Sequence, residues 1–459
     1  MRVRASLLYC TFGSEKLCDP LDPLSNLACS RIDLGFVMSD IELCYLCFTA
    51  ASLVPALLGI LWTGDLFDPR VFLLVYWLSY SSQLSSYFLV GALPANIVEP
   101  YTCPVLICAA VSSLVFGVTI SLMIKRTPAR IRTAEEQEFL VASRNVALLI
   151  MLVFSVVILF YAIQNGGLNF HKATFRDSKS DFDKTFYRLL IVVTMLSSMI
   201  TISLDSQCWN FNRSKIKAIL ILVIFQIIWC WLMSERNVVL ILVLVGALYR
   251  GIDTWKIRSG ALAMACFMLL FVQLSRSATN QHRRLASSDV NEYVQTKGLP
   301  KFSASLTVFT NVVDTVPERA EHFYGSTYLT SLQTFLPGDP LNARKRSIAT
   351  WFPKNYYYQA NSGVDFAIDA EGYVNFGWIG PPIIFGCISL CLVLLYNSRQ
   401  RFWLAATLYP IVVLVFLGAI RTNSQTTFKM IAGGLVCCLI LRSVALIIAP
   451  RPKISDANA

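Results

Sequence analysis

Apolar runs long enough to cross a lipid bilayer recur along most of this chain. A hydrocarbon core of about 30 Å needs about 20 apolar residues in a helix, and such runs occur at about eleven places. They are 42–62, 71–92, 104–124, 146–164, 188–204, 216–233, 237–250, 257–274, 373–396, 402–420 and 427–448. With 55% hydrophobic and 15% charged residues in a chain of 459, a soluble globular fold is excluded. The sequence therefore predicts an all-α polytopic membrane protein with about eleven transmembrane helices.

The predicted spans fall into two blocks that divide the chain into five parts. These are an N-terminal segment of unknown role (1–40), a first transmembrane block of about eight helices (41–274), a large loop (275–372), a second block of about three helices (373–448) and a tail (449–459). Met38 directly precedes the first span and offers an alternative translational start. Lipid-facing helices leave little room for an extramembrane site, so we expect one in the large loop and at the helix ends beside it.

Positive charge in the short connections predicts the orientation of the chain. Basic residues gather after the third and fifth predicted spans: Lys125, Arg126, Arg130, Arg132, Arg144, Arg213, Lys215 and Lys217. Because short cytoplasmic loops carry an excess of Lys and Arg, both connections are predicted to be cytoplasmic, as is the tail. Alternation then places the 275–372 loop on the opposite side of the membrane. The net charge of +11 accordingly reflects topology and lipid-headgroup binding rather than a nucleic-acid partner.

Two arginines are predicted to lie below the outer membrane surface. The run 237–249 rises only about 20 Å as a helix, which draws Arg236 toward the bilayer, where an arginine needs a polar cavity. Snorkelling to the headgroups or pairing with Glu235 is the alternative. Arg421 is followed by the polar stretch 422–427, which forms either the hydrated outer half of the last span or a plain external loop. Either arginine is a candidate anion-binding group.

Inside the large loop, basic residues precede a group of aromatic residues. The set comprises Arg344, Lys345, Arg346, Trp351, Phe352, Tyr356, Tyr357 and Tyr358. Basic groups bind phosphate oxygens through charge-assisted hydrogen bonds, and aromatic faces suit sugar rings. A solvated charge run beside the loop's own aromatic core would have the same composition, and both interpretations stay open.

Two further residues of the loop are candidates for a general base. Glu371 lies at the mouth of a predicted span, where it would accept a proton from a sugar hydroxyl or cap a helix N-terminus. His322, between Glu321 and Phe323, is the second candidate, with ordinary packing or pairing as its alternative.

The loop is also predicted to contain two short helices. Leu306, Phe309 and Val313 repeat at helical spacing, which indicates an amphipathic helix at the membrane interface or against the core. Ser326 is a suitable N-cap for a helix that carries Leu329, Leu332 and Phe335 and stops at Pro337.

Several short motifs resemble the Wzy-type oligosaccharide repeat-unit polymerases, a GT-C-like class of membrane glycosyltransferase that assembles O-antigen and capsule. The resemblance rests on Ser234-Glu235-Arg236, on Tyr324-Gly325-Ser326-Thr327-Tyr328-Leu329 leading to Pro337, on Glu371 through Gly380, and on Arg421. It covers residues 40–448 in layout. One departure concerns the loop proline, which the family often follows directly with an arginine. Here Gly338 and Asp339 follow it, and the basic cluster begins at Arg344.

The resemblance implies an enzyme of the bacterial inner membrane that acts on undecaprenyl-diphosphate-linked glycans at the periplasmic face. The growing chain would pass from its lipid carrier to the non-reducing end of a new lipid-linked repeat unit. Arg236 and Arg421, assisted by Arg344 or Lys345, would stabilise the departing diphosphate. Glu371, with His322 behind it, would be the base, and Trp351, Tyr356 and Tyr357 would bind glycan. Such a scheme requires no metal or other cofactor, and its partners would be chain-length regulator and flippase proteins.

Three other functions remain open on the sequence alone. An O-antigen ligase shares the many spans and the large loop but transfers finished glycan to the lipid A core. A flippase or other transporter of lipid-linked oligosaccharide forms no bond; such proteins commonly show internal repeats and charged residues in mid-span, and neither is found in this sequence. A membrane scaffold for an assembly complex is the third.

Overall fold

The computed structural model describes residues 39–63, 68–90, 97–125, 134–164, 305–333, 366–399, 401–420 and 422–448, with 93, 200, 348 and 351–352. From Asp40 onward these residues belong to one compact unit. All regular structure in them is helical, which confirms the predicted all-α class. Four described helical segments are long and apolar enough to cross a membrane: Asp40–Gly59, Glu99–Met123, Ile368–Ser398 and Ser424–Ile448.

Helices occupy seven of the predicted spans, while the four between 188 and 274 fall outside the described residues apart from Ile200. In chain order the elements are α1 (Asp40–Thr63), η2 (Pro69–Val71), α2 (Phe72–Val90), η3 (Glu99–Tyr101), α3 (Thr102–Met123), α4 (Ala134–Gln164), α11 (Ser305–Thr315), α12 (Ser326–Gln333), α14 (Ile368–Phe376), η5 (Gly377–Ile379), α15 (Gly380–Ser398), α16 (Trp403–Ala419) and α17 (Ser424–Ile448). The total of eleven spans stays a prediction.

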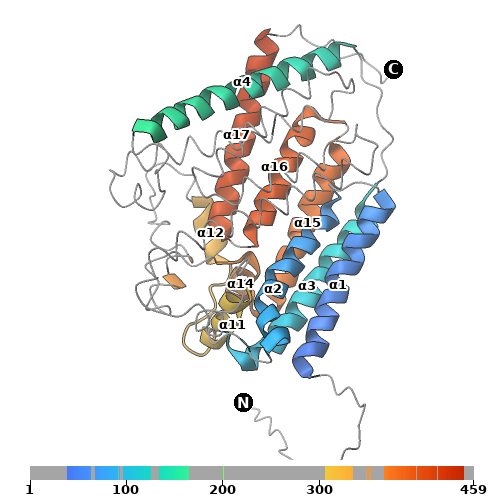
Figure 1. Ribbon diagram of the computed structural model, residues 1–459, viewed down its shortest axis with the longest axis vertical. Coiled ribbons are helices and arrows are strands. Elements are labelled where there is room, and N and C mark those ends of the chain that lie inside the picture. The colour runs from blue at the N-terminus through green and yellow to red at the C-terminus, as the bar shows by residue number, and fades with distance from the viewer. Residues whose placement is uncertain are drawn as a thin grey trace, which may run out of the picture. The chain divides into compact units, whose positions relative to one another are not determined.

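The loop helices α11, α12 and α14 gather at one end of the long helices (Figure 1). Gln83 on α2 accepts hydrogen bonds from the amide and the hydroxyl of Thr307 on α11, at 3.0 and 2.9 Å. The Ser305 hydroxyl donates to the carbonyl of Ile420, directly after α16, at 2.8 Å. Residues far apart in sequence therefore meet at this end, which we call the loop end.

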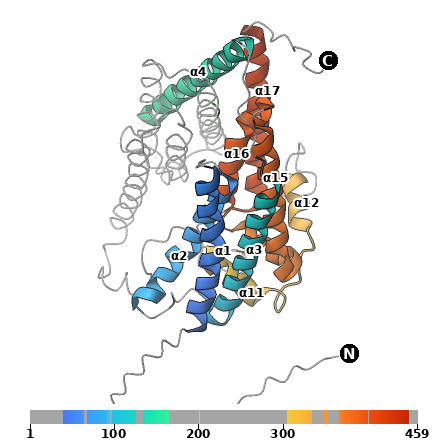
Figure 2. The same cartoon turned by 90° about the vertical axis from the view of Figure 1, so that its right-hand side faces the viewer.

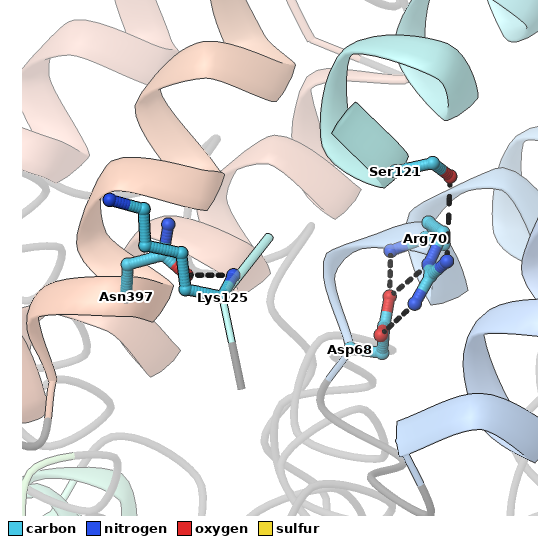
Figure 3. Close-up of polar contacts among 5 residues, drawn as sticks. All are labelled: Asp68, Arg70, Ser121, Lys125 and Asn397. Atoms are coloured by element: carbon cyan, nitrogen blue, oxygen red, sulfur yellow. Dashed lines mark hydrogen bonds and ion pairs between the residues drawn. The ribbon is translucent and has the colours of Figure 1, made fainter. Parts of the chain in front are cut away.

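Polar contacts at the opposite end join the turn before α2, the end of α3 and the end of α15 (Figure 3). Arg70 forms a buried two-point ion pair with Asp68, with nitrogen to oxygen distances of 2.8 and 2.7 Å, and reaches Ser121 at 3.4 Å. The Lys125 amide donates to Asn397 Oδ1 at 2.9 Å, and Asn397 donates to the carbonyl of Met123 at 2.9 Å. The C-terminal ends of α3 and α15 thus lie side by side.

Helix α4 runs in a different direction from the neighbouring long helices. Its residues 146–164 were predicted to form a span, and Figures 1 and 2 show the helix inclined steeply to α17. It packs there through Phe139, close to Trp403 and Ala445.

The predicted span 373–396 is divided in the structure. Helix α14 ends at Phe376, and Gly377 adopts a left-handed φ of 62° that favours glycine. The chain then folds back so closely that a Cβ on Gly380 would overlap the Gly372 carbonyl oxygen. The long helix therefore begins at Gly380, seven residues later than predicted, and α14 is a separate buried helix against its start.

This close approach predicts that Gly380→Ala is strongly destabilising. The atoms that the added methyl group meets are backbone atoms of Gly372 and Tyr373, so relief requires α14 to move away from α15, at a cost of about 2 kcal/mol or more. Gly418→Ala on α16 is the matched control, because nothing lies within 4 Å of its added methyl group. Thermal unfolding in detergent should show a lower midpoint for the first variant alone; equal midpoints would refute the fold-back.

Helix α11 forms where the spacing of Leu306, Phe309 and Val313 predicts it. Its residues are buried on nearly every side, including Thr307, Val308 and Thr310, and it packs on α2, α3 and α14. Of the two positions predicted for this helix, the one against the core is therefore confirmed.

Candidate functional site

Three segments separated in sequence meet at the loop end: α12, α14 and the start of α17. Ser331 on α12 and Ser424 on α17 share a hydrogen bond of 2.8 Å between their hydroxyl oxygens. Asn375 on α14 donates to the Thr327 hydroxyl on α12 at 2.7 Å. The first two of these segments contain two of the motifs on which the sequence resemblance rests, 324–329 and 371–380, so the structure brings those two motifs together.

Glu371 connects α14 to α17 through both of its carboxylate oxygens. The Ser424 amide donates to Oε2 at 2.7 Å, and the Ser424 hydroxyl donates to Oε1 at 2.6 Å. A helix N-terminus presents unpaired amides and favours negative charge, so the carboxylate stabilises the first turn of α17. It is fully buried and already engaged, which makes it an organising group, and the capping interpretation is the one that the geometry favours.

Asp369 is a second buried carboxylate on α14, and the sequence analysis did not single it out. Its Oδ2 accepts hydrogen bonds from Tyr80 at 2.5 Å and Tyr76 at 3.0 Å, both on α2, and its Oδ1 accepts the Ala370 amide at 2.7 Å. Among the described residues neither Asp369 nor Glu371 forms an ion pair. Hydrogen bonds from neutral donors therefore hold both carboxylates, and they fix α14 between α2 and α17.

Asn375 completes the attachment of α14 to the loop. Besides Thr327, its amide group donates to the Glu371 carbonyl at 2.8 Å, and its Oδ1 accepts the Gly325 amide at 2.9 Å. The Tyr324 amide donates to the backbone carbonyl of Asn375 at 3.1 Å. A buried asparagine in a stretch otherwise rich in apolar residues was the available sequence signal for this role.

His322 lies in the same cluster, half-buried at the C-terminal end of α14. Its Nδ1 is 3.2 Å from the Val374 carbonyl oxygen, and because a carbonyl can only accept, Nδ1 must carry the proton. In the neutral ring the lone pair is then on Nε2. This nitrogen lies beside Gly377, 3.8 Å from the point that a Cβ on Gly377 would occupy. This tautomer leaves His322 able to accept a proton from a bound molecule, whereas both oxygens of Glu371 are occupied.

Tyr328 on α12 differs from its neighbour Thr327 in how its hydroxyl is satisfied. The Tyr328 hydroxyl is buried near Asn375 but forms no hydrogen bond of good geometry with the described residues. Burial, followed by the nearby charges of Glu371 and Asp369, raises the pKa of Tyr328 well above its usual 10.0. It therefore stays neutral at physiological pH.

This contrast predicts that Thr327→Val and Tyr328→Phe, two substitutions that nearly preserve side-chain shape, differ in their effect on the free energy of unfolding. Thr327→Val removes the acceptor of an Asn375 amide hydrogen, which should cost about 1–3 kcal/mol. Tyr328→Phe removes an unpaired hydroxyl and should be neutral or slightly stabilising. Unfolding midpoints of the two variants, measured side by side, test this; a Tyr328→Phe variant that is the less stable of the two would contradict the assignment.

Six of the predicted site residues lie outside the described residues: Arg236, Arg344, Lys345, Tyr356, Tyr357 and Arg421. Residues on either side of Arg421 are held at the loop end: Ile420, directly before it, by Ser305, and Ser424, three residues after it, by Glu371. Trp351 is half-buried and packs edge to face on Phe323, with ring centroids 4.8 Å apart. That contact favours the aromatic-core interpretation for Trp351 over glycan binding.

Comparison with protein-family models, with curated proteins and with solved structures finds no match. The described helices define an all-helical chain with several segments apolar enough to cross a membrane. Any assignment of a function to this protein must therefore be argued from the residues of the loop end.

Proposed function

We propose that this protein is a membrane glycosyltransferase that joins lipid-diphosphate-linked oligosaccharide repeat units into a polysaccharide. The observation that supports the proposal is the attachment of α14 to α17 by Glu371, which brings α14, the neighbouring His322 and the start of α17 together. The lipid carrier would be undecaprenyl diphosphate in a bacterial inner membrane, and the loop end would face the periplasm. The product would be O-antigen or a capsular polysaccharide.

Each chemical requirement of the reaction has a proposed residue. An acceptor hydroxyl oxygen bonds to the anomeric carbon of the donor glycan, and the bond from that carbon to the lipid diphosphate breaks. His322 Nε2 takes the hydroxyl proton, as its tautomer allows. Arg421, together with Arg236 and Arg344 or Lys345, stabilises the charge on the departing diphosphate. Glu371, the other candidate base in the sequence, positions the start of α17, which lies three residues after Arg421.

Gene deletion tests the proposal against its rivals. A polymerase deletion leaves one repeat unit on the lipid carrier or on the final acceptor, whereas loss of a ligase leaves long lipid-linked chains. Loss of a flippase leaves single lipid-linked units on the cytoplasmic face, and loss of a scaffold reduces several steps together. Electrophoresis of extracted glycans, with a plasmid copy restoring the gene as control, separates these outcomes, and any pattern other than single external repeats contradicts the proposal.

A further inference from the structure

Tyr324 adopts a backbone conformation that residues other than glycine rarely take. Its φ is 47°, and among the described residues it is the one non-glycine residue with a positive φ. A left-handed tyrosine costs free energy, so surrounding contacts must hold it there. Those contacts are three backbone amides: Phe323 donates to Val374 O at 3.0 Å, Tyr324 to Asn375 O at 3.1 Å, and Gly325 to Asn375 Oδ1 at 2.9 Å.

The effect of this turn is to present an aromatic ring outward. The side chain of Tyr324 is 78% exposed and that of Phe376 is 42% exposed. The Phe376 ring lies against Gly325, 3.3 Å from the point that a Cβ on Gly325 would occupy. Phe376 in turn stacks on Tyr328, with an interplanar angle of 15°. The ring of His322 lies near that of Tyr324, with centroids 6.4 Å apart. We call Tyr324 and Phe376 the aromatic platform.

We propose that the aromatic platform binds an uncharged pyranose ring of the acceptor repeat unit, and that this places a sugar hydroxyl beside His322. The inference rests on the proposed function and names the acceptor subsite within it. Aromatic faces pack against the C–H faces of sugars, while the tyrosine hydroxyl remains a polar handle.

The charges around the platform favour a sugar over a phosphate. The exposed charged residues on the adjoining turn are Glu318, Arg319 and Glu321, and Arg319 approaches Asp314 at 3.5 Å. A surface with this acidic excess repels diphosphate but can accept hydrogen bonds from sugar hydroxyls. The diphosphate would therefore bind at the arginines and the glycan at the platform.

Anchoring in the bilayer interface is the competing explanation for exposed aromatic residues. Trp378 and Ile379, 42% and 68% exposed at the start of the long helix, have the position and chemistry for that task. An anchor needs neither a strained backbone nor a neighbouring histidine with a free nitrogen. The geometry of Tyr324 therefore favours sugar binding.

The test uses the full-length protein in lipid vesicles. The donor is preformed lipid-linked polymer, and the acceptor is labelled lipid-linked single repeats. These single repeats are extracted from cells that lack this gene. Tyr324→Asn is the informative variant, because asparagine tolerates the left-handed conformation and removes the ring. Tyr324→Phe keeps the ring. Leu332→Asn, on α12 and 51% exposed, is the matched control for lost apolar surface on the same side.

For Tyr324→Asn we expect an acceptor KM raised about tenfold with kcat within about twofold of wild type. Tyr324→Phe and Leu332→Asn should behave as wild type, and His322→Gln should lower kcat instead. An unchanged KM for Tyr324→Asn alongside an active wild type overturns the platform alone. Equal losses of vesicle insertion in Tyr324→Asn and Leu332→Asn would identify an anchor and also overturn it. An inactive wild type would instead overturn the proposed function.

Discussion

The Glu371→Gln variant is expected to lose at least about 100-fold in the rate of chain lengthening and to unfold at a lower temperature than wild type. The carboxylate accepts two hydrogen bonds from Ser424, one at each oxygen. A glutamine side chain has one acceptor oxygen, so if that oxygen accepts from the Ser424 amide, its NH₂ group faces the Ser424 hydroxyl, which must turn from donor to acceptor. The neutral side chain also removes the negative charge that stabilises the first turn of α17. The start of α17 would then shift, and the connection containing Arg421 would move with it.

A second glutamate serves as the control that separates the loss of these hydrogen bonds from the loss of a negative charge in general. Glu318→Gln changes an exposed glutamate on the same loop and should leave both rate and stability unchanged. His322→Ala should reduce the rate without lowering the unfolding temperature, and by less than Glu371→Gln does. If Glu371→Gln unfolds like wild type but is inactive, Glu371 is the base rather than an organising group, and the assignment to His322 fails.

The Arg421→Ala variant is expected to insert normally in the membrane and to accumulate single-repeat products. Removal of one group that stabilises a developing negative charge typically costs about 10²–10³ in rate. Arg421→Lys should recover part of the activity, since lysine keeps the charge but not the two-point geometry. Glycan electrophoresis after expression in a deletion strain provides the measurement, and Arg236→Ala should give the same pattern.

The control for this prediction is an arginine at the other end of the helices. Arg401 is exposed in the turn before α16, and Arg401→Ala should leave chain length normal. Long chains from Arg421→Ala at wild-type protein level would remove Arg421 from the site. Short chains from both variants would point to a general requirement for basic residues.

The positions of the long helices could be predicted because apolar length is a local property of the sequence. The break at Gly377 could not, since a window of about 20 residues averages across Gly377 and Gly380. The three glycines at 372, 377 and 380 were the signal, but close backbone approach depends on the fold. The same limit applies to α11, whose apolar spacing predicted a helix but not burial on both faces.

The sequence predicted individual residues of the candidate site but not the hydrogen bonds that join them. Glu371 and His322 were singled out from residue type and position, and the structure places Glu371 on α14 and His322 beside the end of that helix. The partners of Asp369 were invisible, because Tyr76 and Tyr80 lie 293 and 289 residues away in sequence. The role of Asn375 was also missed, since its hydrogen bonds reach a turn 50 residues earlier. Long-range pairing of polar groups arises only when the helices are packed.

Reconstitution provides the most direct measurement of the central claim, that the loop end forms glycosidic bonds between lipid-linked repeats. Purified protein in vesicles would be incubated with lipid-linked single repeats as its sole substrate. The account predicts a ladder of longer glycans, with one lipid diphosphate released for each bond formed. Single repeats that stay unchanged, or that cross the bilayer without being joined, would contradict it.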